Sequence, residues 1–157
     1  MTIRVTGLFP RDEYYMRLAL REAERALEHD DVPIGAVVVH AGEVIAAARN
    51  ERELRGDPTA HAEILALREA AGRLDSWRLL NTVLYVTLEP CAMCAGAIVL
   101  ARVPRVIYAA DDPKAGAAGS VLDVLAEPRF NHRPTLARGL LAEEAAGLLR
   151  AFFASRR

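Results

Sequence analysis

The chain has 157 residues, a length that fits one hydrophobic core, so we expect a single domain over residues 1–157. Its composition, 52% hydrophobic and 26% charged, is ordinary for a globular enzyme, and its two cysteines are too few for a disulfide scaffold. No apolar run has the form of a signal peptide or approaches the ~20 residues of a membrane helix. We therefore expect a cytoplasmic protein with no membrane partner.

The net charge of −1 gives no overall attraction to nucleic acid, but the charge is unevenly distributed. Residues 101–157 carry nine basic and six acidic residues, a balance of +3, whereas the first hundred residues carry −4. A basic C-terminal third can meet the phosphates of a nucleic acid. The same arginines can equally well solvate the outer faces of helices, and charge alone leaves both interpretations open.

The first part of the chain predicts a helix followed by a hairpin. Residues 1–10 have no periodic pattern and are expected to form a loose arm. Residues 11–29 carry apolar side chains at helical spacing, which predicts an amphipathic helix with Asp12 as its N-cap. The β-branched segment 34–40 predicts a strand, and residues 43–48 predict its hairpin partner after an Ala-Gly turn.

A polar loop over residues 49–58 leads to a second helix. We expect Thr59 to cap this helix and the strongly helix-forming segment 60–73 to build it, which places His61 in or beside the first turn. Residues 81–88 form the clearest strand pattern, and they are apolar enough to lie in the centre of the sheet.

The second half of the chain continues the alternation of helices and strands. Pro90 suits the first position of a helix over 91–101, and residues 105–109 predict a strand parallel to the one before that helix. Residues 111–120 form a long loop at a strand end, where open α/β sheets bind their ligands. The remaining expected elements are a short helix over 121–125, a turn at Asn131-His132, an edge strand over 135–138 and a helix over 143–155.

The two cysteines, Cys91 and Cys94, stand in C-x-x-C spacing, which puts both sulfurs on one side of a helical turn. With His61 they provide three ligands that suit Zn²⁺, and no third cysteine exists to close a structural tetrahedron. A catalytic zinc site leaves its fourth position to water, and Glu63 is placed to handle a proton on that water. We expect one zinc ion per chain and a hydrolytic reaction. A redox pair and two buried structural cysteines are the alternatives.

If the helix over 60–73 arrives from the same side as the helix over 91–101, two helix N-termini converge on this metal, and their unpaired N–H groups stabilise its thiolates. Zinc coordination lowers the pKa of water from 15.7 towards about 7, so that a hydroxide nucleophile forms at neutral pH. Glu63 would take a proton from it and deliver it to the substrate during the hydrolysis. Such positioned acid–base catalysis contributes ~10²–10⁴-fold.

Two further places in the chain have both a structural and a functional interpretation. Asn50 ends the second hairpin strand, where a lone asparagine is most often a turn former. Phe152 and Phe153 are adjacent, so they point about 100° apart on a helix and cannot both face the core equally. Both rings could serve a core or an interface, or one could stack on a nucleobase near Arg156 and Arg157.

Over essentially its full length the sequence resembles the bacterial tRNA-specific adenosine deaminases, which carry the zinc deaminase signature His-x-Glu followed by Pro-Cys-x-x-Cys. Segments that would fit several deaminase relatives are Pro33–Val39, Asp57–Glu63 and Leu84–Ala97. The segments that point specifically to the tRNA enzymes are the 112–120 loop, Asn131-His132 and Phe152-Phe153.

The resemblance implies an α/β fold, a three-layer α/β/α sandwich with a five-stranded mixed sheet of the cytidine deaminase type. It also implies hydrolysis of adenosine to inosine at the wobble position of a tRNA anticodon, classically in an arginine tRNA, by a homodimer. By the same resemblance Glu63 shuttles protons, Asn50 binds the target base and Asp112 contacts the anticodon stem-loop. The other candidate RNA contacts are Phe153, Arg156 and Arg157.

Two departures from the family pattern concern RNA affinity. Asp111 stands where some members have Arg, which removes a positive charge, and the chain stops at Arg157, where some relatives carry a longer basic tail. A deaminase of a free nucleobase or nucleotide (guanine, cytosine or dCMP) would share the zinc site without needing a basic, aromatic C-terminal helix. A noncatalytic zinc-stabilised RNA-binding module would need a fourth ligand, for example His132, and would not need Glu63.

Overall fold

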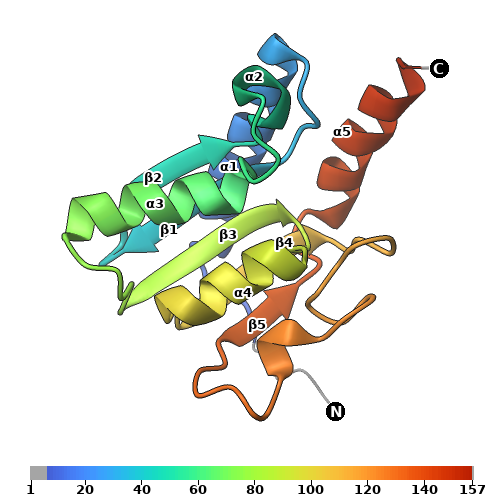
Figure 1. The fold of residues 1–157 in the computed structure, drawn as a ribbon. Helices are drawn as coiled ribbons and strands as arrows, with labels where there is room; N and C mark the ends of the chain where they lie inside the picture. Colours follow the sequence, from blue (N-terminus) through green and yellow to red (C-terminus); the bar gives the residue numbers. More distant parts are fainter. Residues whose placement is uncertain (1–6, 157) are drawn as a thin grey trace.

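A five-stranded mixed sheet forms the centre of the computed structural model, which describes residues 7–156 (Figure 1). The strands are β1 (Gly35–His40), β2 (Glu43–Arg49), β3 (Thr82–Leu88), β4 (Arg105–Ala110) and β5 (Thr135–Arg138), in the spatial order β2-β1-β3-β4-β5. β1 pairs antiparallel with β2 and β3. β3, β4 and β5 run parallel, and the pairing of β3 with β4 confirms the prediction that the strands before and after the cysteine-bearing helix are parallel.

Helices cover both faces of the sheet. The first face carries α1 (Asp12–Ala26) and α5 (Ala142–Ala154), and the other carries α3 (Ala62–Leu74) and α4 (Ala92–Ala101) (Figure 1). The shorter helical segments are η1 (Leu27–His29), α2 (Arg52–Arg55) and η2 (Val124–Ala126). The predicted three-layer α/β/α sandwich is therefore confirmed.

Successive residues of the strands lie in two separate hydrophobic cores, one on each face of the sheet, because side chains alternate across a pleated sheet. In β1, Val38 packs into the core below α3 and α4, whereas Val37 packs into the core below α1 and α5. Gly35, at the start of this strand, lies directly against α1, where an added Cβ would collide with the carbonyl oxygen of Ala19. The close approach of helix and strand there requires glycine.

A buried ion pair ties α1 to the sheet. Asp12 accepts hydrogen bonds from Arg105 in β4, at 2.7 and 2.9 Å, and from the hydroxyl of Tyr85 in β3, at 2.6 Å. The prediction that Asp12 caps the first helix is wrong, because Arg11 occupies the N-cap position and Asp12 turns towards the sheet. A carboxylate can be buried at this place since its oxygens are paired and hydrogen-bonded.

The predicted cap of the second long helix is also wrong. The backbone amide and the hydroxyl of Thr59 both donate to the carboxylate of Asp57, at 2.8 Å, and His61 holds the N-cap position of α3. Residues 57–59 therefore form a local turn before the helix, and α3 itself begins at Ala62.

The segment predicted as a polar loop contains the short helix α2. Its first turn forms because Asp31 accepts the backbone N–H groups of Glu53 and Leu54, at 2.6 and 3.1 Å. The predicted helix over 121–125 is reduced to the single turn η2. The first six residues of the predicted N-terminal arm lie outside the described residues. Along the stretch from residue 7 to residue 156, none of the helices combines the length and the apolar character that a bilayer crossing requires.

Candidate active site

Two helix N-termini meet at the carboxyl end of β3. After Leu88 the chain passes through Glu89 and Pro90 and enters α4, with Cys91 at the N-cap position. α3 begins directly after His61, which is its own N-cap residue. Both N-cap residues have an extended backbone, and their side chains lie close together. The condition for the convergence of two helix N-termini is therefore met.

His61, Cys91 and Cys94 form a cluster with the dimensions of a metal site. Nδ1 of His61 lies 3.6 Å from Sγ of Cys91 and 3.5 Å from Sγ of Cys94, and the three ligand atoms all lie within 4.8 Å of one another. In a tetrahedral zinc site, bonds of ~2.3 Å to sulfur and ~2.0–2.1 Å to nitrogen place such atoms about 3.6 Å apart. The donor set and its spacing therefore fit zinc.

Hydrogen bonds within the cluster favour a thiolate at Cys91. Hydrogen bonds from Cys94 and from the imidazole of His61 lower the pKa of Cys91 to about 3, although burial acts in the opposite direction. The hydrogen bond to Cys91, together with burial, raises the pKa of Cys94. The same thiolate raises the pKa of His61 by accepting its hydrogen bond. Because metal ligands must be deprotonated, a cation that binds here would displace the remaining protons.

Glu63 lies beside the cluster but is not one of its three ligand residues. It belongs to the first turn of α3, is only 4% exposed, and lines the same cavity as His61 and Cys91. Burial raises the pKa of Glu63 to about 7, an effect that its backbone hydrogen bond and the positive charge of His61 only partly offset. A carboxyl group with such a pKa can accept and donate a proton near neutral pH.

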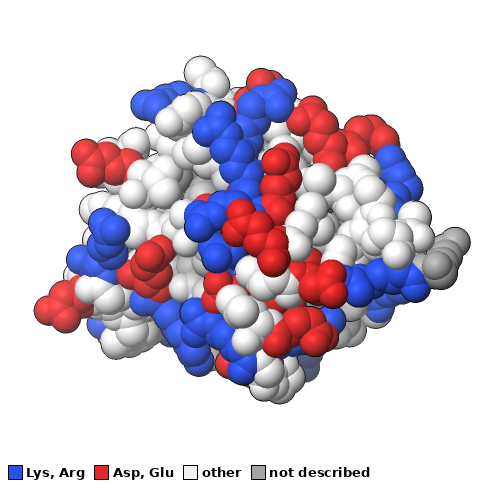
Figure 2. Space-filling model, turned by 90° about the horizontal axis from the view of Figure 1, so that it is seen from above, with Lys and Arg blue, Asp and Glu red and all other residues white. Residues whose placement is uncertain are grey.

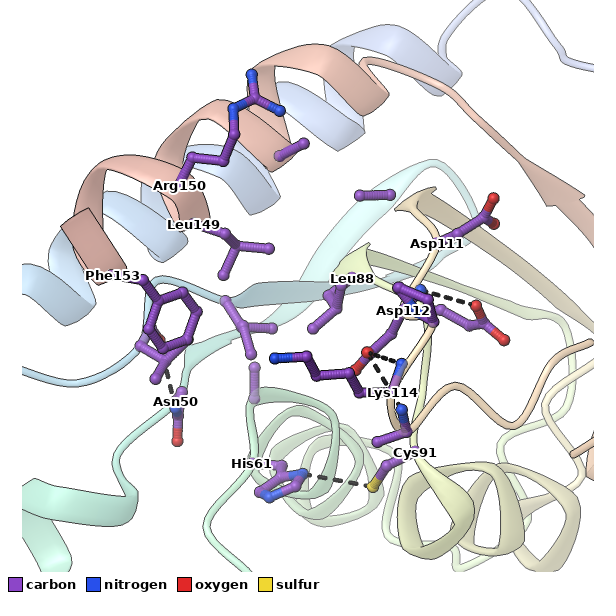
Figure 3. A pocket seen from close by; sticks show the side chains of 18 of the residues that line it. Asn50, His61, Leu88, Cys91, Asp111, Asp112, Lys114, Leu149, Arg150 and Phe153 are labelled. Carbon is purple, nitrogen blue, oxygen red and sulfur yellow. Dashed lines mark hydrogen bonds between the residues drawn. The ribbon is translucent and has the colours of Figure 1, made fainter. Parts of the chain in front are cut away.

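A cavity of about 1000 Å³ opens beside the cluster (Figure 3). Its walls come from the N-terminal ends of α3 and α4, the loop after β4 and one side of α5. Figure 3 shows His61 and Cys91 at its base, Asn50 and Phe153 on one side and Asp112 on the other. The cavity therefore brings together residues from distant parts of the sequence, and its volume suits a small-molecule or nucleotide ligand.

Asn50 lies in the cavity wall, where two backbone contacts hold its side chain. Its carbonyl oxygen accepts the N–H of Arg52 at 3.1 Å, and its amide nitrogen donates to the carbonyl oxygen of Val32 at 3.3 Å. These bonds use one donor and one acceptor site of the side-chain amide, so that one of each is left for a ligand. Asn50 thus has the structural role of a turn former and also the position of a ligand contact.

The adjacent phenylalanines of α5 face different surroundings, as their helical spacing predicts. Phe152 is buried, with 8% of its surface exposed, whereas Phe153 is 50% exposed and lines the cavity. Their ring centroids lie 5.3 Å apart at an interplanar angle of 80°. Of the two rings, that of Phe153 is the one placed to meet a ligand.

Arg156, one of the two C-terminal arginines named from the sequence, is not among the residues that line the cavity. Arg156 pairs with the carboxylate of Asp30, and its guanidinium lies 4.1 Å from the ring centroid of Phe152. Arg157 lies outside the described residues. Arg156 therefore fastens the end of α5 to the segment that follows α1.

His132, the fourth ligand that a noncatalytic zinc module would need, is engaged elsewhere. Its Nε2 lies 2.6 Å from the carbonyl oxygen of Val103. Among residues 7–156, the group of side chains arranged to hold a metal comprises His61, Cys91 and Cys94 alone. Three protein ligands beside an open cavity are the arrangement of a catalytic site.

The cavity lining also includes residues that the sequence analysis does not single out. Arg150 in α5, Arg52 in α2 and Glu89 after β3 contribute to it. Arg150 precedes Phe153 by three residues, so helical spacing could have placed both on one face. Glu89 is a charged residue at the end of an apolar strand, and this unusual place is the local signal that could have identified it.

Positive and negative side chains are interspersed over the face of the molecule that Figure 2 shows. The cavity lining has the same mixture, with the basic residues Arg52, Lys114 and Arg150 and the acidic residues Asp111 and Asp112 in addition to the two buried glutamates. On this face the positive balance of the C-terminal third does not produce a separate basic surface. Any attraction of this face for RNA would therefore be local to particular side chains.

Sequence comparison places the chain in a known family. The profile of the MafB19-like deaminases matches residues 11–157. The tRNA-specific adenosine deaminase of Bacillus subtilis (strain 168) is 52% identical over 143 residues, which cover 91% of this chain and 89% of that protein. The chain belongs to the family of the tRNA-specific adenosine deaminases.

Solved structures share the fold of this deaminase. One, from work on A-to-I editing by tRNA:A34 deaminases at the wobble position of transfer RNA, has a TM-score of 0.84 and 48% identity, over 87% of this chain and 99% of that chain. Guanine deaminase from Nitrosomonas europaea has a TM-score of 0.79 and 28% identity, over 98% of this chain and 88% of that chain. Of these two structures, the deaminase described here is nearer to the tRNA enzyme.

Proposed function

We propose that this deaminase hydrolyses adenosine to inosine at the wobble position of a tRNA anticodon, with an arginine tRNA as the first candidate substrate. The observation that carries the proposal is the cavity lined by Glu63, by His61 and Cys91 of the ligand cluster, and by Phe153 of the last helix. The 52% identity to a tRNA-specific adenosine deaminase, over 91% of the chain, supports the substrate class.

In this proposal His61, Cys91 and Cys94 hold one zinc ion per chain. Nδ1 of His61 would be the ligand nitrogen, since it is the ring atom that lies within 3.6 Å of both sulfurs. A bound zinc ion supplies Lewis-acid chemistry, which lowers the pKa of water from 15.7 to about 7 and so provides a nucleophile at neutral pH.

Glu63 would carry out the proton transfers. Deamination adds the oxygen of water to C6 of adenine and releases the amino group as ammonia. A proton must therefore leave the water, and protons must reach the neighbouring ring nitrogen and the departing amino group. The carboxyl of Glu63 is buried in the cavity wall next to the ligand residues, where it can pass protons over a short path.

The cavity walls would bind a base that has left its stack. The half-exposed ring of Phe153 offers a stacking surface, and Asn50 retains a donor and an acceptor for the edge of the base. Asp112 and Lys114, in the loop after β4, would meet the sugar and phosphate groups of the anticodon stem-loop. A base in a single-stranded loop is the suitable substrate, because it leaves its stack at lower cost than a base in a duplex.

We further propose that the enzyme is a homodimer. Met93, Ala97 and Leu100 follow helical spacing on α4, where Met93 and Ala97 are half-buried and Leu100 is 69% exposed. An exposed apolar stripe on a helix supports contact with a second copy of the chain. A cytoplasmic location follows from the proposed substrate, and the two free cysteines suit a reducing compartment.

The test compares three substrates at equal concentration: an anticodon stem-loop of an arginine tRNA with adenosine at the wobble position, free adenosine, and guanine. We expect inosine from the stem-loop and little product from the two small molecules. Glu63→Gln serves as the control that keeps the shape of the cavity but removes the proton carrier. Turnover of guanine or adenosine as efficient as that of the stem-loop would replace the proposal by a small-molecule deaminase.

A further inference from the structure

Glu89 is a buried carboxylate that is neither one of the three proposed metal ligands nor the proposed proton carrier. It follows β3, is 2% exposed, and stands two residues before Cys91. Each hydrogen bond that the structure gives this carboxylate comes from the loop over residues 112–120. The donors are the backbone N–H of Asp112 at 2.9 Å, of Ala118 at 2.9 Å and of Ser120 at 3.1 Å, and the hydroxyl of Ser120.

This set of partners saturates the carboxylate. An ionised carboxylate offers about four lone-pair sites, and the loop supplies three N–H groups and one O–H. Hydrogen bonds to a charged acceptor are about twice as strong as neutral ones. The loop is therefore wrapped around one side chain that belongs to a different part of the chain.

The loop also packs directly against this carboxylate and against the turn that carries the first cysteine. A Cβ on Gly116 would collide with the carboxyl carbon and both oxygens of Glu89, so the loop needs glycine there for space. The N–H of Ala117 donates to the carbonyl oxygen of Pro90 at 2.8 Å, and Gly116 forms an isolated β-bridge with Cys91. The loop is thus attached both to Glu89 and to the two residues that follow it.

The same loop forms one wall of the active-site cavity. Asp112, Pro113, Lys114 and Ala115 all line it. The carboxylate of Asp112 accepts the N–H groups of Lys114 and Ala115, at 3.0 and 3.2 Å, and so folds the turn that presents Lys114. Since Glu89 holds the N–H of Asp112, it fixes the start of this turn.

We propose that Glu89 is a positioning residue that holds the 112–120 loop against the turn that carries Cys91, so that Asp112 and Lys114 are preorganised to bind the substrate. The inference rests on the proposed function, because it assigns to this wall the sugar and phosphate groups of the anticodon loop. A glycine-containing loop without such an anchor would lose conformational entropy each time it bound RNA, and substrate binding would weaken.

Glu89→Gln tests the proposal, because glutamine keeps the shape but has one oxygen acceptor and presents an NH₂ group to N–H donors. We expect full zinc content and a KM for the stem-loop raised roughly tenfold, with kcat changed by less than about threefold. Hydrogen–deuterium exchange at the amides of Asp112, Ala118 and Ser120 should quicken roughly tenfold or more. Exchange needs no substrate, so it reports on the loop independently of the RNA assay.

Two further variants approach the same contact from the loop. Gly116→Ala should raise KM and quicken exchange as Glu89→Gln does, and Ser120→Ala, which removes one donor, should do so less. Glu13→Gln, at a glutamate whose side chain is 60% exposed on α1, is the matched control and should change neither quantity. If Glu89→Gln does not fold, Gly116→Ala and Ser120→Ala decide the matter by the same measurements.

Unchanged exchange and an unchanged KM in the folded variants would overturn the proposal. Loss of zinc, or a lower kcat at constant KM, would also overturn it, because Glu89 would then act on the metal ligands or on the chemistry. If wild-type enzyme does not turn over the stem-loop, the proposed function fails by itself. The hydrogen–deuterium exchange data would still show whether Glu89 holds the loop. If the loop amides of Glu89→Gln are protected as in wild type, the positioning role of Glu89 is rejected as well.

Discussion

Phe152 and Phe153 provide a matched pair of truncations, because they are the same residue type at adjacent positions of α5 with opposite surroundings. Phe152→Ala removes a ring that is 8% exposed, and Phe153→Ala removes one that is 50% exposed and lines the cavity. The two variants should therefore separate protein stability from substrate binding.

The size of each effect follows from these environments. Truncation of a buried phenylalanine costs about 3–5 kcal/mol, and we expect the lower end for Phe152 because it lies in the last turn of α5. A loss of about 3 kcal/mol in a chain of this size lowers Tm by about 6–12 °C. Stacking of an aromatic ring on a base is worth about 1–3 kcal/mol, so Phe153→Ala should lower kcat/KM for the stem-loop by roughly 5- to 150-fold.

Thermal unfolding of both variants, together with steady-state kinetics on the stem-loop at a temperature where both are folded, measures the two effects. Phe153→Ala should keep Tm within about 2 °C of wild type, since surface substitutions have small effects on stability. The reasoning is refuted if Phe153→Ala destabilises the protein as much as Phe152→Ala does, or if it leaves kcat/KM unchanged.

Three other predictions concern the metal cluster, the proton carrier and the ion pair below α1. Cys91→Ser should lose its zinc, so elemental analysis of this variant after dialysis should give a metal content near zero, and full occupancy would contradict the ligand assignment. Glu63→Ala should keep its zinc and lower the rate by ~10²–10⁴-fold, and a variant that loses metal and activity together would show Glu63 to be a ligand. Burial raises the pKa of Asp12, but hydrogen bonds from Arg105, the Phe9 amide and Tyr85 outweigh it and hold this pKa below its ordinary value of 3.8. This stabilisation is present above pH ~4 and is lost as the pH falls through the lower, folded-state pKa. The difference in free energy of unfolding between wild type and Asp12→Asn should therefore shrink on acidification, and urea unfolding that gives a constant difference would contradict the assignment.

The architecture was open to prediction from local patterns because most of its elements have strong ones. The β-branched segment that forms β1 and the apolar segment that forms β3 are both recognisable, and a strand–helix–strand order predicts the parallel pairing of β3 with β4. The helix-forming segment 60–73 and the position of Pro90 also place His61 and Cys91 near the starts of helices. Because the starts of these two helices flank the end of the central strand β3, His61 and Cys91 are brought together there.

The features that sequence analysis misses depend on contacts between residues far apart in the chain. The carboxylate of Glu89 receives hydrogen bonds from residues 23 to 31 positions later, and no local pattern reports this. No local pattern indicates that Arg156 pairs with Asp30, which lies 126 positions earlier. α2 forms because Asp31 reaches its first turn from 22 positions away. In each case a polar side chain is held by tertiary structure that hydrophobic periodicity does not encode.

The central claim, deamination at the wobble position, is tested most directly by mapping inosine in a full-length arginine tRNA that carries adenosine at that position and elsewhere in the anticodon arm. After incubation with the zinc-loaded enzyme, nucleoside-resolved sequencing of the product should find inosine at the wobble position and adenosine at every other position. The Glu63→Ala variant should leave the tRNA unchanged. Inosine at several positions, or none under conditions in which guanine is deaminated, would contradict the account.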